Sequence, residues 1–381
     1  MARKRVLICG YYGNYNLGDE AMLTGMLRLL RQEHDQWRVT VFSKDTQDTK
    51  IRHSVEAIPY QSGEFKAQYN LTLLQNQYFI LGGGDLLRDS VNNSKAERWL
   101  RPLQQAIRLR RRTLVLGISV GEIWRKETQK IIPQVLDQVN LLAVRDADSK
   151  TQLEKLGVRK NIHVMSDLAL HGLPELSPQS TTHLANQPIQ IGIAVRPLVK
   201  SGYSTDVNAY FKFQQEIAAI ADFLAEQYGA TIHFFPFQAL KTGYHPTDDD
   251  RISILNILRY SRCSNQFVVH HYFESLQNLI QLISQLDLTI GMRLHSLILS
   301  AGLGVPVIAV EYASKVRGFM QEIGQGEYSI PIECFNREQL LPIIRDILND
   351  PLMARKHVAA GIKNYRQGRS GIQQVLAQTL A

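Results

Sequence analysis

Four side chains capable of binding or acid–base chemistry stand within one short stretch, GMRLHSLILSAGLGVPVIAVEYASK at positions 291–315. They are a guanidinium, an imidazole, a carboxylate and an amine, carried by Arg293, His295, Glu311 and Lys315. The pattern of apolar residues predicts a strand at 287–290, a helix at 294–303 and a second parallel strand at 305–310. Because the carboxyl ends of parallel strands meet at one edge of a sheet, we expect these side chains around one crevice, where doubly wound sheets bind ligands.

The same residues also have a plainer interpretation, in which His295 is a half-buried helix residue and Arg293 pairs with a local carboxylate. The convergence of four polar side chains on one sheet edge favours a binding site instead. An arginine beside a helix N-terminus favours an anionic ligand.

Length and composition indicate a two-domain globular protein. The chain has 381 residues, of which 44% are hydrophobic and 20% charged, and this length exceeds what one core usually supports. The net charge of +8 suits an acidic ligand or an anionic surface. The longest uncharged run, 294–310, is interrupted by glycine and proline and is too short to span a membrane. Three cysteines without metal or redox spacing, and no signal-peptide pattern, predict a cytoplasmic protein, soluble or peripheral at the inner face of the membrane.

The first strand, at 5–9, leads into a loop rich in Gly, Asn and Tyr at 10–18 and then a helix at 21–31. The spacing is not GxGxxG, and acids at the helix start would repel a phosphate. Asp19 is the expected N-cap. Three side chains are candidates for contacts to hydroxyl groups, although simple helix capping also explains the acids: Asn16, Asp19 and Glu20.

Two further strand ends carry candidate residues. A predicted strand at 78–81 is followed by three glycines and an aspartate, and glycines allow a backbone to approach a ligand closely or to turn tightly. The candidates here are Gly83, Gly84 and Asp85. A strand at 141–144 ends in Arg145, just before a helix that should begin near 148–149.

A stretch rich in Pro, Ser and Thr at 171–188 reads as a linker between two alternating β/α series. We therefore predict an N-terminal Rossmann-like domain at 1–175, a C-terminal one at 188–345, and terminal helices at 346–381 that can cross back onto the first domain.

Clusters of charge have competing explanations. Arginines at 108–112 and bases beyond 352 are either solvated helix ends or attractors of anionic lipid headgroups; aromatic residues are not interleaved with them, so nucleic acid is not expected as a partner. His245 and the aspartates at 248–250 resemble metal ligands, but helix capping explains the aspartates, and no metal is predicted.

Several segments together resemble the polysaccharide pyruvyltransferases, close to the bacterial CsaB-type enzymes. They are GYYGNYNLGDEAM (10–22), LGGGDLLRD (81–89), GISVG (117–121), VRDADS (144–149), SDLAL (166–170), IGIAVRPL (191–198) and the stretch at 291–315. The resemblance implies a fold similar to GT-B glycosyltransferases and transfer of pyruvyl from phosphoenolpyruvate to a sugar as a cyclic ketal. It also implies that Arg145, His295 and Lys315 occupy the family's functional positions.

The residues suit that chemistry. Phosphoenolpyruvate is small and highly anionic, and Arg145, Arg293 and Lys315 would grip its carboxylate and phosphate. His295 is the candidate acid or base. An acidic side chain would orient or deprotonate the acceptor hydroxyls, the candidates being Asp19, Glu20 and Glu311. No step requires a metal or redox cofactor.

Two other functions fit the same architecture. One is a nucleotide-sugar glycosyltransferase, which would need a slot for the base and acids for the ribose. The other is a non-catalytic module that binds a glycan. The identity of the saccharide acceptor, including whether it is lipid-linked, is not encoded in any recognisable motif.

Overall fold

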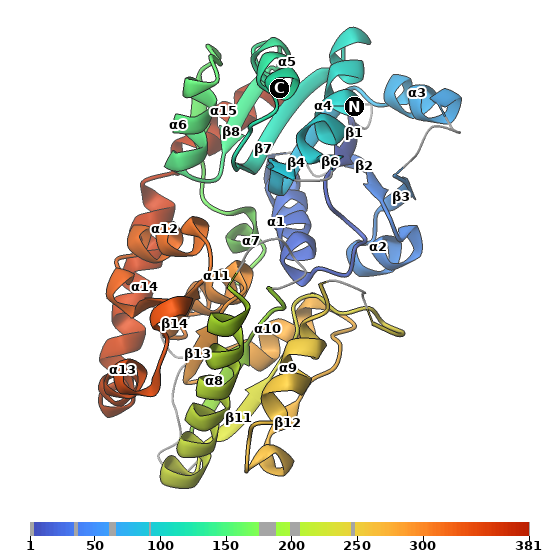
Figure 1. The fold of residues 1–381 in the computed structure, drawn as a ribbon. Coiled ribbons are helices and arrows are strands. Elements are labelled where there is room, and N and C mark those ends of the chain that lie inside the picture. Colours follow the sequence, from blue (N-terminus) through green and yellow to red (C-terminus); the bar gives the residue numbers. More distant parts are fainter. Residues whose placement is uncertain are drawn as a thin grey trace. The chain divides into compact units, whose positions relative to one another are not determined.

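The computed structural model describes residues 4–33, 37–60, 66–90, 93–174, 188–198, 206–244 and 248–380. These form two compact units (Figure 1). Unit 1 comprises residues 1–14, 19–172 and 366–381, and unit 2 comprises residues 15–18 and 173–365. Most of the predicted linker, and His245, lie outside the described residues.

Unit 1 is built on a seven-stranded parallel sheet with the order β3-β2-β1-β4-β7-β8-β9. Its strands are β1 (Lys4–Cys9), β2 (Trp37–Ser43), β3 (Glu56–Pro59), β4 (Tyr78–Leu87), β7 (Arg112–Val120), β8 (Leu141–Val144) and β9 (Ile162–Val164). A two-stranded hairpin, β5 (Asp89–Ser90) and β6 (Asn93–Ser94), follows β4. The chain order reverses between β1 and β4, which makes the carboxyl end of these two strands the expected ligand crevice of this unit.

Helices cover both faces of this sheet. They are α1 (Leu17–Glu33), α2 (Thr46–His53), α3 (Lys66–Gln75), α4 (Lys95–Arg108), α5 (Lys126–Leu136), α6 (Ala147–Lys155), α7 (Leu168–His171) and α15 (Gly371–Leu380). One core joins side chains of α3 to α6 to strand residues such as Phe79 and Val115, which are fully buried. The strands are near-continuous apolar runs because parallel strands are buried on both faces.

Unit 2 repeats the architecture with a six-stranded parallel sheet, ordered β12-β11-β10-β13-β14-β15. Its strands are β10 (Gln190–Ala194), β11 (Thr231–Phe234), β12 (Val268–Val269), β13 (Leu288–Gly291), β14 (Val307–Glu311) and β15 (Ser329–Pro331). The switch in strand order falls between β10 and β13.

The helices of unit 2 are α8 (Val207–Tyr228), α9 (Asp250–Leu258), α10 (Leu276–Ser284), α11 (Leu294–Gly302), α12 (Ser314–Glu322), α13 (Arg337–Asn349) and α14 (Pro351–Gln367). A core of α8, α9 and α13 side chains packs on one face of the sheet, with Phe213 and Ile344 among its fully buried members. Among the described residues, no helix is both long enough and apolar enough to cross a membrane.

The terminal helices divide between the units. The boundary falls in the last turn of α14, so residues up to 365 group with unit 2 and residues 366–381 with unit 1. Helix α15 is held to unit 1 by its last carbonyls. Lys4 and the hydroxyl of Tyr78 donate to the carbonyl of Leu380, and Arg112 donates to that of Thr379 at 3.3 Å. The terminal helices thus do not form a third compact unit. Figure 1 shows both chain ends in unit 1.

Two local predictions were wrong. Helix α1 begins at Leu17, so Asp19 lies in its first turn and is not the N-cap. The three glycines do not follow a strand but lie inside β4, which continues to Leu87 with a register shift near its end. Gly83 and Gly84 have φ of 75° and 91°, a backbone conformation that residues with a Cβ rarely adopt.

Candidate functional site in unit 2

The carboxyl ends of β10, β13 and β14 lie side by side in unit 2, at and beside its switch point. The chain leaving each of them carries polar side chains. Arg196 follows β10, Arg293 and His295 follow β13, and Lys315 follows β14. The strand–turn–helix–strand unit expected from the sequence is therefore confirmed.

Two helix N-termini open onto this edge. His295 is the second residue of α11, and Lys315 is the second residue of α12. Arg293 is the N-cap of α11 with extended backbone, and its carbonyl accepts a hydrogen bond from the hydroxyl of Ser296 at 2.6 Å. Because the N-terminal amides of a helix carry partial positive charge, this edge is electrostatically suited to an anion.

Arg293 is committed to carboxylates inside unit 2. It is 7% exposed, and its guanidinium donates to Asp250 at 3.0 Å through Nε and to Asp248 at 2.9 Å through Nη2. Burial lowers the pKa of Arg293, but the two carboxylates outweigh it and raise that pKa above its ordinary value. The structure thus supports the plainer interpretation, in which Arg293 pairs with local carboxylates, and its predicted grip on a substrate stays a prediction.

Asp250 forms the centre of this buried pair. It is fully buried, and its Oδ2 also accepts the backbone amides of Phe237 and Gln238, each at 2.9 Å. Burial raises the pKa of Asp250 towards the neutral form, with Arg293 opposing the shift. We regard the pair as ionised, because its oxygens accept only N–H donors and a guanidinium stays charged.

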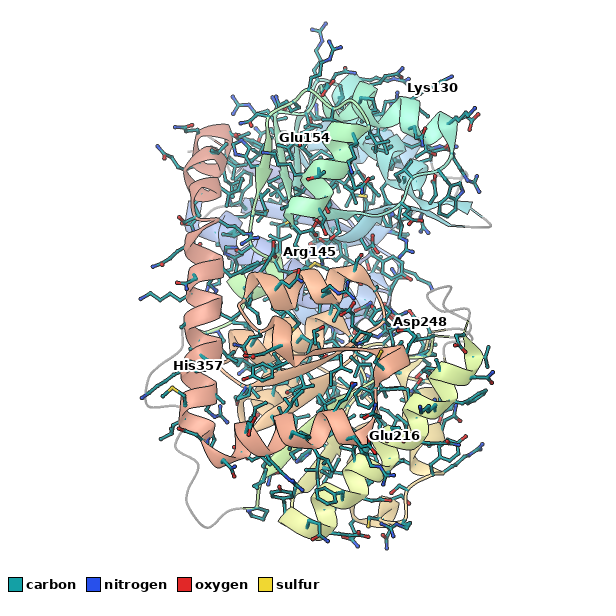
Figure 2. All side chains as sticks on the ribbon, turned by 60° about the vertical axis from the view of Figure 1, so that its left-hand side comes forward. Lys130, Arg145, Glu154, Glu216, Asp248 and His357 are labelled. Carbon is teal, nitrogen blue, oxygen red and sulfur yellow. The ribbon has the colours of Figure 1, made fainter. Side chains whose placement is uncertain are left out.

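Arg196 and Tyr312 are site residues that the sequence interpretation missed. Arg196 is 4% exposed, donates to Asp248 at 2.9 Å and to the hydroxyl of Tyr312 at 3.2 Å, and lies over the Tyr312 ring. Burial favours the neutral phenol, but the charges of Lys315, Arg196 and Arg293 outweigh it and hold the pKa of Tyr312 below its ordinary value of 10.0. The sequence contained a signal that could have identified Arg196. It stands just after the carboxyl end of β10, as Arg145 stands just after that of β8. Figure 2 labels Asp248, the carboxylate that joins the two arginines.

Glu311 is paired within its own helix–strand unit. Its carboxylate contacts the guanidinium of Arg317 on α12 and accepts the hydroxyl of Ser329 at 3.3 Å. Its charge is therefore already balanced, which leaves the predicted contact to a sugar hydroxyl without support from the geometry.

The segment Tyr15–Gly18 belongs to unit 2 and positions the imidazole. Asn16 forms an antiparallel bridge with Gln238, and the amide of Leu17 donates to the carbonyl of Phe237 at 2.9 Å. The side chain of Asn16 accepts the amide of Gly18 at 3.0 Å, so it shapes this turn. A Cβ on Gly18 would lie 2.2 Å from Nδ1 of His295, which means that the imidazole lies directly against the Gly18 backbone.

Replacing Gly18 with alanine is expected to displace the imidazole and to lower turnover by about 10²-fold, the cost of a misplacement of about 1 Å. The matched control is Gly318→Ala in α12, where an added Cβ meets nothing within 4 Å. That variant should keep wild-type activity. Equal activity of the two variants in a steady-state assay would contradict a functional role for this close approach.

Unit 1 brings together Asp19, Gly83 and Gly84 at its own switch point. Asp19 is 8% exposed, and its Oδ1 would lie 2.9 Å from a Cβ on Gly84. The hydroxyl of Tyr12 donates to the carbonyl of Gly82 at 2.6 Å and closes the loop over β4. Asp85, the fourth candidate, pairs with Arg88 at 3.0 Å.

Glu20 is internal and pairs with groups of unit 1. It is 1% exposed, its Oε1 accepts the amide of Gly13 at 2.9 Å, and its Oε2 is 2.7 Å from Nε2 of His53. Nδ1 of that imidazole is 3.3 Å from the hydroxyl of Thr24. Glu20 therefore fixes the loop that precedes α1, and its predicted substrate contact stays a prediction that this geometry does not support.

Arg145, which Figure 2 labels, pairs with two helix-capping aspartates of unit 1. Its Nη1 donates to Asp167 at 3.3 Å, and its Nε lies 3.6 Å from Asp146. These aspartates cap α7 and α6 respectively. Arg145 is 5% exposed; it belongs to unit 1 and His295 and Lys315 to unit 2, so its predicted role beside them stays a prediction.

Helix capping accounts for part of the acidic cluster, since Asp249 caps α9 and its two neighbours pair with arginines. Within the described ranges, no group of three or more His, Cys, Asp or Glu is arranged to hold a metal ion. Several bases in the two basic regions donate to backbone carbonyls, namely Arg111, Arg112, Arg355 and Arg366.

Comparisons with known proteins agree with this architecture. A family model described as polysaccharide pyruvyl transferase matches residues 16–314. The amylovoran biosynthesis protein AmsJ of Erwinia amylovora is 24% identical over 311 residues, which are 80% of this chain and 73% of that protein.

Solved structures of an epimerase and of a glycosyltransferase share the fold. UDP-GlcNAc 2-epimerase from Neisseria meningitidis, bound to UDP-GlcNAc, aligns with a TM-score of 0.59 at 12% identity over 99% of each chain. A glycosyltransferase from Rickettsia africae aligns with a TM-score of 0.56 at 11% identity, again over 99% of each chain. At these identities the likeness concerns the fold alone, and it confirms the GT-B-like class expected from the sequence.

Proposed function

Because this chain belongs to the polysaccharide pyruvyl transferase family, we propose that it transfers pyruvyl from phosphoenolpyruvate to a sugar of a cell-surface polysaccharide or of its lipid-linked precursor. The product is a cyclic ketal, and phosphate is released. The role of AmsJ in amylovoran biosynthesis supports a polysaccharide acceptor.

The observation that carries the proposal is the electrostatic character of the carboxyl edge of β10, β13 and β14. The N-termini of α11 and α12 both open there, together with the charge of Lys315 and that of Arg196, which Asp248 partly balances. A three-carbon acid with a carboxylate and a phosphate needs such a concentration of positive charge. Asp248 and Asp250 neutralise most of the charge of Arg293, so this residue organises the edge and Lys315 acts on the donor.

The proposed reaction moves two protons, and at C2 it replaces the π bond and the bond to the phosphate oxygen by two bonds to sugar oxygens. A proton is delivered to the methylene carbon of the donor, which becomes a methyl group and leaves C2 electrophilic. One sugar hydroxyl attacks C2, the bond from C2 to the phosphate oxygen breaks, and a second hydroxyl closes the ring. The two hydroxyl protons balance the one taken up by carbon and the one carried away by phosphate.

His295 and Tyr312 are the groups proposed to move these protons. An imidazole serves as acid or base near neutral pH, and the position of His295 against Gly18 limits how its ring can turn. Tyr312 has a phenol whose proton is easier to remove than usual, because cations surround it. We assign proton delivery to His295 and proton removal from a hydroxyl to Tyr312. Asp19 remains the candidate for orienting the acceptor from unit 1.

The function is tested by incubating the protein with phosphoenolpyruvate and candidate glycans. Mass spectrometry should detect the gain of one pyruvyl group on an acceptor, with release of an equal amount of phosphate. Lys315→Ala should weaken phosphoenolpyruvate binding and lower the rate, since it removes a charge from the donor side. Lys363→Ala, an exposed lysine on α14, is the control for loss of one charge. A thermal shift with UDP-sugars but none with phosphoenolpyruvate would favour a glycosyltransferase and overturn the proposal.

A further inference from the structure

Unit 1 contains a cavity of about 740 Å³ at the amino-terminal edge of its sheet, where β1 and β2 begin. The ligand crevice predicted for this unit lies at the opposite edge, so the cavity is not part of it. Its volume is within the range of about 300–1,000 Å³ typical of small-molecule sites. The cavity is bounded by the C-terminal half of α1, the first residues of β1 and β2, and the turn from α2 into β3.

The lining of the cavity combines apolar and cationic side chains. Leu27 and Leu30 of α1, both almost fully buried, line it together with Trp37. The lining also carries three exposed arginines from three different elements, namely Arg5, Arg31 and Arg38. The acidic side chain in the lining, Glu56, lies 3.8 Å from the amine of Lys50.

The three arginines differ from neighbouring bases in their contacts. Lys4 and Arg112 hold the last carbonyls of α15. By contrast, the guanidinium groups of Arg5, Arg31 and Arg38 have no hydrogen-bond or ion-pair partner among the residues that the structure describes. The dipole of α1 accounts for a base at the end of that helix, where Arg31 stands, but not for arginines at the starts of two strands.

We propose that this cavity binds a phosphate-bearing amphiphile, such as an anionic lipid headgroup with the first carbons of its chains. The three guanidinium groups would grip the phosphate, for which arginine has the matching fork of donors. Leu27, Leu30 and Trp37 would cover the apolar part, and tryptophan favours such polar–apolar boundaries. The site is independent of the proposed transferase activity and would attach unit 1 to an anionic surface.

The test uses the full chain and the fluorescence of Trp37. Short-chain phosphatidylglycerol, kept below its micelle concentration, should change the emission and saturate, whereas short-chain phosphatidylcholine and inorganic phosphate should bind far more weakly. The change should be absent in Trp37→Phe, which separates it from the other two tryptophans. Arg31→Gln and Arg38→Gln should each weaken binding by about tenfold, because each removes a charged hydrogen-bond donor.

The control is Arg159→Gln, which removes an exposed arginine just before β9, at the other end of the same sheet edge. It should bind phosphatidylglycerol as the wild type does, in solution and in vesicles. An equal loss of affinity for phosphatidylglycerol in Arg31→Gln, Arg38→Gln and Arg159→Gln would show general surface attraction and overturn the proposed site. If inorganic phosphate bound as tightly as phosphatidylglycerol, the ligand would not be an amphiphile and the proposal would be wrong. The absence of a saturable change in Trp37 emission would also overturn it. Pyruvyl transfer measured on a soluble acceptor should be unchanged in these variants. A failure of the proposed lipid site can therefore be distinguished from a failure of the proposed transferase function.

Discussion

Replacing His295 with alanine is expected to lower turnover by about 10²–10⁴-fold, the usual contribution of a positioned acid or base. The fold should survive, because His295 is half-buried at the start of α11 and the substitution removes no core side chain. The measurement is the steady-state rate of pyruvyl transfer, with phosphoenolpyruvate binding followed separately. Turnover within a few-fold of wild type would show that His295 is not the acid or base.

The matched control is His357→Ala, which removes an exposed imidazole from α14 of the same unit and should leave the rate unchanged. Added imidazole should restore part of the rate of His295→Ala, because it can occupy the space left beside Gly18. Rescue of this kind distinguishes proton transfer from a purely structural role of the side chain.

The variant Tyr312→Phe separates the two proposed proton transfers. It keeps the ring beside Arg196 and removes the hydroxyl, so donor binding should persist while the rate falls. The pKa of Tyr312 is lowered, so the phenolate becomes more abundant as pH rises through a value below 10.0. A base at this position therefore predicts a rate that increases over that range in the wild type and not in Tyr312→Phe. The same pH profile in both proteins would remove Tyr312 from the mechanism.

Replacing Arg293 with methionine is expected to destabilise the protein by about 3–5 kcal/mol, because Asp250 would be left as a buried charge without its partner. For a unit of this size this corresponds to a melting temperature lower by roughly 10 °C. The second substitution Asp250→Asn should recover part of the loss, since it removes the charge and keeps an oxygen for the amides of residues 237 and 238.

An exposed ion pair of unit 2 provides the comparison for Arg293. Arg262 pairs with Glu226 at 3.2 Å and lies 3.7 Å from Asp222, and its own side chain is 75% exposed. Arg262→Met should cost no more than about 1 kcal/mol. Denaturant titrations of both variants measure the difference, and similar midpoints would contradict the buried role assigned to Arg293.

Replacing Arg293 is also expected to displace the imidazole of His295, through the backbone segments that connect them. Asp250 holds the amides of residues 237 and 238, and this segment pairs with Tyr15–Gly18, which lies against His295. At a temperature where Arg293→Met is folded, its turnover should therefore also fall. The arginine is a positioning residue, although the sequence interpretation placed it on the substrate.

The sequence by itself determined the two parallel-sheet units and the edge on which His295 and Lys315 stand. Apolar runs, glycines and prolines are local signals, and they record which backbone segments must be buried and where a helix can begin. Only the tertiary structure decided which charges are already paired. Arg293 and Asp250 lie on different elements, 43 positions apart, and no local pattern indicates that they meet. The same holds for Glu20 with His53 and for Arg196 with Tyr312, because the partner of a buried charge is chosen by the strand order that brings distant segments together.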